Sequence, residues 1–94
     1  MNTNASATLV RLRHEIDAVD RRLLMLMAKR QKLVLEVGKQ KRTNGIPVTD
    51  IGREQVIISV LQKQGRILGL TDAFIRGLMT IIFKESKRVQ KGKI

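Results

Sequence analysis

Residues 9–37 read LVRLRHEIDAVDRRLLMLMAKRQKLVLEV, and apolar side chains recur along this stretch at steps of three and four residues. That spacing is typical of an amphipathic helix with a packing stripe on one face. The stripe consists of Leu9, Leu12, Ile16, Val19, Leu23, Leu26, Leu33 and Val37. No glycine or proline precedes Gly38, and the breaker residues Asn44-Gly45 and Pro47 follow. The pattern predicts one helix over about 8–41.

The length of this helix predicts a partner. About 34 helical residues span roughly 50 Å, whereas a compact chain of 94 residues has a diameter of about 32 Å. The apolar stripe would extend beyond the core of its own chain, and a second copy is the simplest way to bury it. We therefore expect an obligate homodimer built around paired long helices. The alternative is a break near Arg30, although no breaker residue occurs there.

Two shorter helices are predicted downstream of the loop. The first follows a cap at Thr49 or Asp50 and frays near residues 65–69. The second follows Thr71-Asp72, either of which can cap it, and ends near Gln90. We find no internal repeat, low-complexity segment or strand-like alternation. The expected fold is all-α, with three helices per chain.

The composition excludes several kinds of site. There is no Cys, Trp or Tyr, and only two Phe and one His occur, so disulfides, thiol catalysis and Cys-type metal sites are ruled out. His14 alone cannot form a metal site or a catalytic dyad, and we expect no metal and no cofactor. The core must be aliphatic, which argues against recognition of nucleic acid by base stacking. With no signal-peptide pattern and no long apolar run, a single cytoplasmic domain over residues 1–94 is expected, without a membrane span.

Net charge is the strongest compositional signal. The chain has 19 Lys and Arg against 8 Asp and Glu, a formal net charge of +11. Such an excess attracts polyanions, acidic membrane surfaces or small anionic substrates. On charge alone, a nucleic-acid-binding helical dimer is the first hypothesis. It does not explain why cations also lie on the apolar stripe.

Two cations lie on the face that the long helix should bury. Arg30 occupies a stripe position, and Lys41 lies eleven residues later, about 16 Å along the same face. Cations on a buried face need anionic partners, which acidic side chains of another helix or one small dianion could supply. Arg13 flanks the stripe about 25 Å before Arg30 and cannot reach the same ligand within one chain. In an antiparallel dimer, Arg13 would lie beside the middle of the partner helix.

Polar residues also occur on the apolar faces of the shorter helices. Asp50, Arg53 and Glu54 open the second helix, where capping and an exposed ion pair would be their ordinary roles. Ser86 and Gln90 continue the apolar line of the third helix at helical spacing. They could form a hydrogen-bonding wall for a ligand, or they could mark the point where that helix reaches the surface.

Taken in order, these residues resemble the all-helical chorismate mutases, especially the mutase domain at the front of bacterial prephenate dehydratase fusions. The resemblance runs without a gap from about Leu9 to Gln90. Its segments are LRHEIDAVDRRLLMLMAKR, LEVGKQK, PVTDIGRE and IIFKESKRVQ. It implies interlaced three-helix chains forming a homodimer with two active sites. It also implies the rearrangement of chorismate, a dianion, to prephenate in aromatic amino-acid biosynthesis, without a cofactor and without nucleic acid as a partner.

The resemblance implies a role for each cation of the long helix. Arg13 resembles the arginine that reaches across the dimer to the neighbouring site. Arg30 resembles the main carboxylate-binding arginine. Lys41 resembles the lysine that contacts a carboxylate and the ether oxygen of the substrate.

The resemblance also implies roles on the shorter helices. Asp50 and Glu54 resemble the residues that hold the ring hydroxyl, and Arg53 resembles a supporting arginine. Ser86 resembles the hydroxyl near a carboxylate, and Gln90 resembles the amide that binds the ether oxygen. Lys41, Gln90, Arg30 and Glu54 are therefore the expected catalytic residues.

Two neighbouring activities on the same fold stay open. Isochorismate-pyruvate lyases resemble this family, although the presence of Glu54 favours the mutase. The second neighbouring activity is that of a mutase acting on 4-amino-4-deoxychorismate. Asp50 and Glu54 suit the ring hydroxyl of chorismate slightly better than the amine of that compound. The remaining cations have no assigned role and are expected to form a solvated basic surface. They are Lys29, Lys32, Lys39, Arg42, Lys84, Lys87, Arg88, Lys91 and Lys93.

Overall fold

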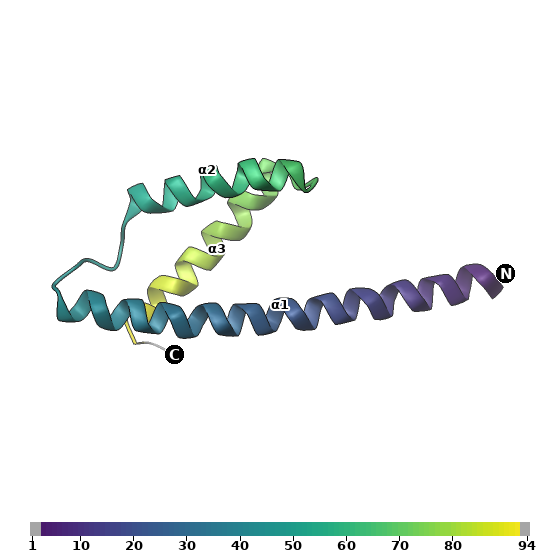
Figure 1. Cartoon of the computed structure of the whole chain (residues 1–94), viewed down its shortest axis with the longest axis horizontal. Helices are drawn as coiled ribbons and strands as arrows, with labels where there is room; N and C mark the ends of the chain where they lie inside the picture. Colours follow the sequence, from purple (N-terminus) through teal and green to yellow (C-terminus); the bar gives the residue numbers. More distant parts are fainter. Residues whose placement is uncertain (1–2, 93–94) are drawn as a thin grey trace. The chain divides into compact units, whose positions relative to one another are not determined.

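The computed structural model describes residues 3–92 and the side chains of residues 4–92. It contains three helices, α1 (Thr3–Thr43), α2 (Ile51–Ile67) and α3 (Asp72–Gln90), as Figure 1 shows. No strand occurs among residues 3–92, which confirms the all-α expectation. The chain divides into two compact units, Met1–Lys32 and Leu33–Ile94. We call them the N-terminal and the C-terminal unit.

The N-terminal unit is helical from its first described residue. α1 begins at Thr3, five residues before the predicted start, because this segment has no breaker residue and the Thr8 hydroxyl donates to the Asn4 carbonyl at 2.8 Å. The helix continues without interruption through Arg30, so the alternative of a break at that position is wrong. The apolar stripe of the unit is exposed within the single chain: Ile16 and Leu23 are 57% and 55% accessible to solvent.

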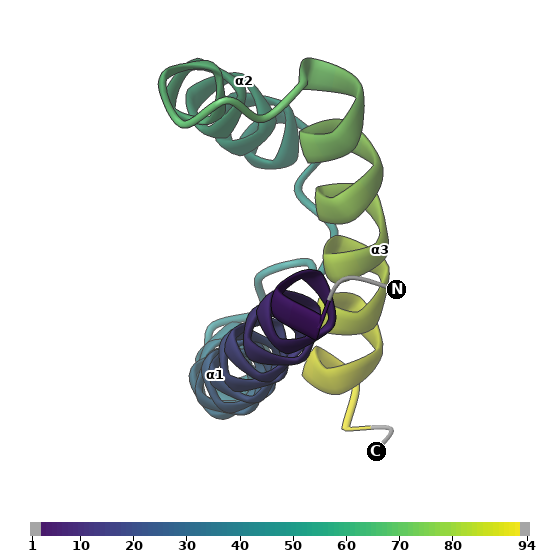
Figure 2. The ribbon, with the colours of Figure 1, turned by 90° about the vertical axis from the view of Figure 1, so that its right-hand side faces the viewer.

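The core of the C-terminal unit lies between α2 and α3. Ile58 of α2 packs with Ile75, Met79 and Phe83 of α3, and Ile57, Leu61 and Ile82 pack against this cluster. Gly65 lets the two helices approach closely, because a Cβ at that position would lie 3.1 Å from the Ile75 Cγ1. Figure 2 shows α2 and α3 joined by their short connecting turn. The core is aliphatic apart from Phe83, as the composition predicts.

The structure decides which residues cap the shorter helices. The Asp50 carboxylate accepts a hydrogen bond from the Arg53 backbone N–H at 3.0 Å. The Thr71 hydroxyl accepts one from the Phe74 backbone N–H at 3.2 Å. Each therefore satisfies a backbone donor that has no partner inside its helix.

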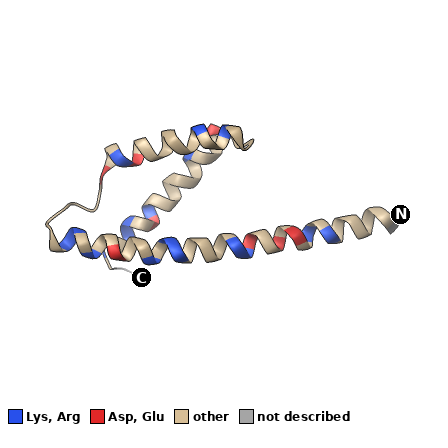
Figure 3. Cartoon of the chain, in the orientation of Figure 1, with Lys and Arg blue, Asp and Glu red and all other residues tan. Residues whose placement is uncertain are grey.

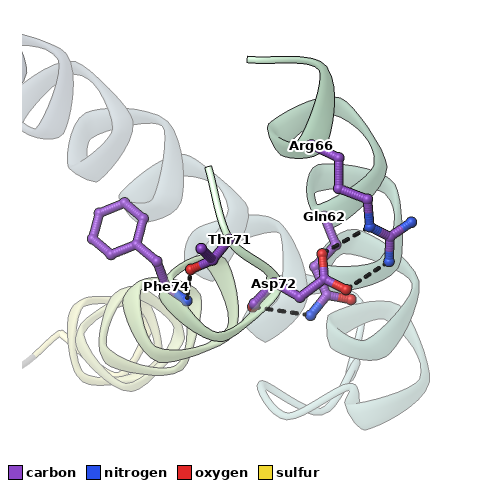
Figure 4. A network of polar contacts seen from close by, with 5 residues as sticks. All are labelled: Gln62, Arg66, Thr71, Asp72 and Phe74. Atoms are coloured by element: carbon purple, nitrogen blue, oxygen red, sulfur yellow. Dashed lines mark hydrogen bonds and ion pairs between the residues drawn. The ribbon is translucent and has the colours of Figure 1, made fainter. Parts of the chain in front are cut away.

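A network of polar contacts fixes the turn from α2 to α3 (Figure 4). Arg66 donates two hydrogen bonds to the Asp72 carboxylate, from Nε at 2.9 Å and from Nη2 at 2.6 Å. Gln62 Nε2 donates to the Asp72 backbone carbonyl at 3.2 Å. The hydrogen bond from Arg66 lowers the pKa of the Asp72 carboxyl. The bidentate pair therefore links the last turn of α2 to the first turn of α3.

Among the described residues, no helix combines the length and the apolar character needed to cross a membrane. The cytoplasmic location stays a prediction.

Candidate active site

The C-terminal unit holds most of the predicted site residues, namely Lys41, Asp50, Arg53, Glu54, Ser86 and Gln90. They come from all three helices and from the residue that caps α2. Arg13 and Arg30 belong to the N-terminal unit.

Gly38 is the point where the last turns of α1 contact the C-terminal end of α3. It is buried, and a Cβ at this position would lie 2.8 Å from the Gln90 backbone oxygen and 2.9 Å from the Gln90 Cα. Only a residue without a side chain allows this approach. One turn later, Arg42 Nη1 donates to the Gln90 carbonyl at 2.6 Å. The guanidinium thus lies at the negative end of the α3 dipole and satisfies a carbonyl of its last turn.

The side chain of Gln90 is buried at this junction, with 8% of the residue exposed. Its Oε1 is enclosed and accepts no hydrogen bond from the residues that the structure describes. Leaving a buried acceptor unpaired costs about 1–3 kcal/mol. The end of α3 is therefore a place where a donor from a ligand or from another chain would be stabilised.

Ser86 lies one turn before Gln90 on the same buried face of α3. Only 7% of the residue is exposed, and its Oγ donates to the Ile82 carbonyl at 2.8 Å. The two polar residues therefore do not mark the emergence of α3 at the surface, which was the ordinary explanation of their pattern. They form the buried polar end of the apolar face of α3.

Glu54 joins α2 to α3 through an ion pair. Its Oε2 lies 3.1 Å from the Nζ of Lys87, and the Glu54 and Lys87 side chains are only 23% and 31% exposed. Lys87 is therefore not one of the solvated cations, and the expectation from the sequence is wrong for this residue. The pair holds the Glu54 carboxylate next to the helix that carries Ser86.

Lys41 lies in the last turn of α1, and Asp50 caps α2 at the end of the connecting segment. Lys41 is half-buried, and its Nζ donates to the Val48 carbonyl at 3.0 Å. An ammonium has three N–H groups, so Lys41 keeps two for a ligand. Asp50 is exposed and uses one oxygen to cap α2, and Arg53 is exposed in the first turn of α2.

In the N-terminal unit, Arg30 is half-buried and Arg13 is exposed. Burial lowers the pKa of the Arg30 guanidinium, because removal from water disfavours the charged form. Arginine nevertheless stays charged at neutral pH. A partly desolvated cation on the apolar stripe is the arrangement that the sequence predicted, and it favours an anionic ligand.

Basic side chains also gather outside these positions. Figure 3 shows Lys and Arg at the C-terminal end of α3. A surface hollow of about 530 Å³ lies there, lined by Ile81, Lys84, Glu85, Lys87, Arg88 and Lys91. None of the predicted site residues lines it.

Residues 3–92 contain no group of three or more His, Asp or Glu side chains suited to a metal ion, and the absence of a metal or cofactor from the protein stays a prediction.

Comparison with known proteins identifies the family of this chain. The family model for chorismate mutase type II matches residues 12–91. The chain belongs to the chorismate mutase type II family. All the predicted site residues, from Arg13 to Gln90, lie inside the matched range.

Curated proteins that are similar to this chain support the same family assignment. The bifunctional chorismate mutase/prephenate dehydratase of Buchnera aphidicola subsp. Schizaphis graminum is 36% identical over 88% of the chain. The protein of the same name from Escherichia coli K12 is 37% identical over 89%, and the T-protein of Enterobacter agglomerans is 36% identical over 93%. The chain spans 22%, 22% and 23% of the lengths of these relatives, respectively.

Sequence reasoning missed three residues at the site. The signal for Gly38 was present, because a lone glycine inside a helical pattern often marks a close approach of another backbone. Arg42 and Lys87 gave no such signal. Their partners, the Gln90 carbonyl and the Glu54 carboxylate, are distant in sequence, so only the tertiary structure distinguishes them from solvated cations.

Proposed function

We propose that this chain is a chorismate mutase, which rearranges chorismate to prephenate in aromatic amino-acid biosynthesis. The observation that carries the proposal is the family match over residues 12–91, with every predicted site residue inside it. We also propose that residues 1–94 serve as one functional domain, because that match covers parts of both units.

The chemistry suits the residues present. The rearrangement is a unimolecular [3,3] process that needs no nucleophile, so the protein has to hold the substrate in a compact conformation and stabilise the developing charge. In the transition state the C–O bond breaks ahead of C–C formation, and negative charge builds on the ether oxygen. Donors fixed at that atom stabilise the transition state more than the substrate. We assign this role to Lys41 and Gln90.

The remaining site residues bind the ends of the dianion in this proposal. Arg30 would pair with one carboxylate, and its partial burial strengthens such a pair, because screening by water is weaker there. Ser86 would contact a carboxylate from the buried face of α3. Glu54 and Asp50 would accept hydrogen bonds from the ring hydroxyl, with Arg53 in support.

We further propose that the active form is an interlaced homodimer in which Arg13 serves the partner's site. The support is the exposed apolar stripe of α1, where Ile16, Leu23 and Leu26 are 57%, 55% and 62% accessible within one chain. Burying such side chains is worth about 1.5–3 kcal/mol each. Sedimentation should give about twice the chain mass of 10.7 kDa, and an active monomer would contradict this arrangement.

The decisive experiment is incubation of the purified chain with chorismate and, separately, with isochorismate. We expect chorismate to disappear with prephenate as the product. Lys41→Ala should lower kcat by on the order of 10²–10³, the range for the loss of one transition-state donor. The matched control is Lys39→Ala, because Lys39 is exposed and pairs with the exposed Glu36.

Other results would favour the alternatives. Release of pyruvate from isochorismate, without turnover of chorismate, would assign the chain to the lyases. No turnover of either compound, together with DNA binding that weakens steeply with salt, would favour the nucleic-acid-binding dimer.

A further inference from the structure

The ion pair between Glu54 and Lys87 places a cation next to a residue assigned to the substrate's ring hydroxyl. The two charged atoms are 3.1 Å apart, and the two side chains are 23% and 31% exposed. Lys87 directly follows Ser86 in α3 and precedes Gln90 by three residues.

This ion pair still allows Glu54 to bind a ligand through its second carboxylate oxygen. A carboxylate has two oxygens with about four acceptor positions, and Lys87 occupies one side of Oε2. Oε1 stays available to accept a hydrogen bond. Because the pair is partly buried and links two helices, it also restricts the orientation of the carboxylate.

We infer that Lys87 determines substrate specificity: it positions Glu54 to accept a hydrogen bond from a neutral ring hydroxyl, and it repels a ligand that carries an ammonium group there. The inference rests on the proposed function, since it concerns the substrate position assigned to Glu54. It selects chorismate over 4-amino-4-deoxychorismate, which carries an amine in place of that hydroxyl.

The physical reason is the repulsion between like charges. A group hydrogen-bonded to Oε1 would lie roughly 5 Å from the Lys87 ammonium, given ordinary hydrogen-bond lengths. A hydroxyl is neutral and meets no repulsion, whereas a protonated amine places a second positive charge at that distance in a partly desolvated site. Specificity achieved by repulsion of the wrong ligand is common in binding sites.

The test compares kcat/KM for the two substrates at a pH where the amine is protonated. Lys87→Met keeps the length of the side chain and removes its charge. We expect it to lower the preference for chorismate over 4-amino-4-deoxychorismate by on the order of tenfold or more. Lys87→Arg should keep the preference. The control is Lys84→Met, which removes an exposed charge one turn earlier in α3 and should leave the preference unchanged.

A second variant keeps the inference testable if Lys87→Met folds poorly. Lys87→Gln retains a hydrogen-bond donor for Glu54 without the charge, and we expect the same loss of preference. A purely structural role would lower kcat/KM for both substrates equally and leave their ratio unchanged, which would overturn the inference while the mutase activity stands. A wild-type chain that turns over neither substrate would overturn the proposed function itself.

Discussion

Gly38 is the residue on which the position of Gln90 depends most directly. The α3 backbone passes so close that a Cβ at residue 38 would meet the Gln90 oxygen at 2.8 Å. The atoms that this Cβ would meet are the backbone oxygen and the Cα of Gln90. Because they belong to the backbone, a side-chain rotation cannot relieve the strain.

Gly38→Ala should therefore destabilise the chain by about 1–3 kcal/mol, the usual cost of overpacking, and should lower kcat because Gln90 shifts. The control is Gly77→Ala in α3, where an added Cβ meets nothing within 4 Å. That change should stabilise the chain by about 0.5–1 kcal/mol, since alanine is the better residue inside a helix. Urea denaturation of both variants checks the prediction, and equal effects would disprove the close approach.

Gln90→Glu tests whether the Gln90 side chain faces the reacting ether oxygen. A carboxyl group can donate a hydrogen bond only when it is protonated. Activity of the variant should therefore be highest at low pH and decline as pH rises through the pKa of the new carboxyl. The measurement is the pH profile of kcat. A profile that matches the wild type would remove Gln90 from the reacting centre.

The sequence predicted which polar residues lie on apolar helix faces, but not which tertiary contacts bury them. The spacing of Ser86 and Gln90 predicted that they share a face. Whether that face is buried depends on Gly38 and Arg42, which belong to another helix. The ambiguity could be settled only by tertiary contacts, because local spacing does not specify which helix packs against which.

The connection between α2 and α3 contains an ion pair whose contribution to stability depends on pH. Arg66 holds the Asp72 carboxylate with two hydrogen bonds, and they lower the pKa of Asp72 in the folded state. Because the folded pKa lies below the unfolded one, the pair contributes stability above the unfolded pKa of about 4, and that stability is lost as pH falls through the folded pKa.

Arg66→Met should therefore reduce the acid dependence of stability. Urea denaturation at about pH 6 and about pH 3 should show a smaller difference for the variant than for the wild type. The Glu85–Arg88 ion pair, which also lowers a carboxyl pKa, is retained in both proteins and serves as an internal reference. An unchanged difference would mean that the pair does not persist in solution.

Helix boundaries were the most predictable level of the structure. Residues with strong local preferences mark them, and the caps at Asp50 and Thr71 are each one of the two candidates that the sequence offered. The start of α1 was predicted too late, at Thr8 rather than Thr3. The first residues of the helix lack an apolar stripe, so periodicity gives no signal there, and α1 continues because nothing breaks it.

For the whole molecule, the sharpest prediction concerns sharing of the site between two chains. Arg13→Ala and Lys41→Ala should each be nearly inactive as homodimers. After the two variants are mixed, unfolded and refolded together, about half of the dimers should contain one of each. If Arg13 serves the partner's site, each such dimer has one intact site, and activity should recover to roughly a quarter of wild type. The helix geometry supports this, since Arg13 lies about 25 Å along α1 from Arg30.

Two results would contradict the shared site. If Arg13 acted within its own chain, every site in the mixture would lack one residue, and mixing would restore nothing. If Arg13 were a solvated surface residue, its variant would be active alone, because exposed charge changes usually cost little. The sequence predicts a shared site only through the length of α1 and the family resemblance, because no residue of a single chain encodes the position of a partner.

The aliphatic interior has an optical consequence. Phe83 is the one aromatic ring in the described core, and the sequence has no Trp and no Tyr, so the protein absorbs hardly any near-ultraviolet light. The conjugated diene of chorismate, the proposed substrate, does absorb there, and the proposed rearrangement to prephenate destroys that conjugation. A single turnover could therefore be followed by absorbance with enzyme in excess over substrate. One tryptophan introduced at the exposed Phe74 would be the sole indole in the chain and would report by fluorescence on its surroundings alone.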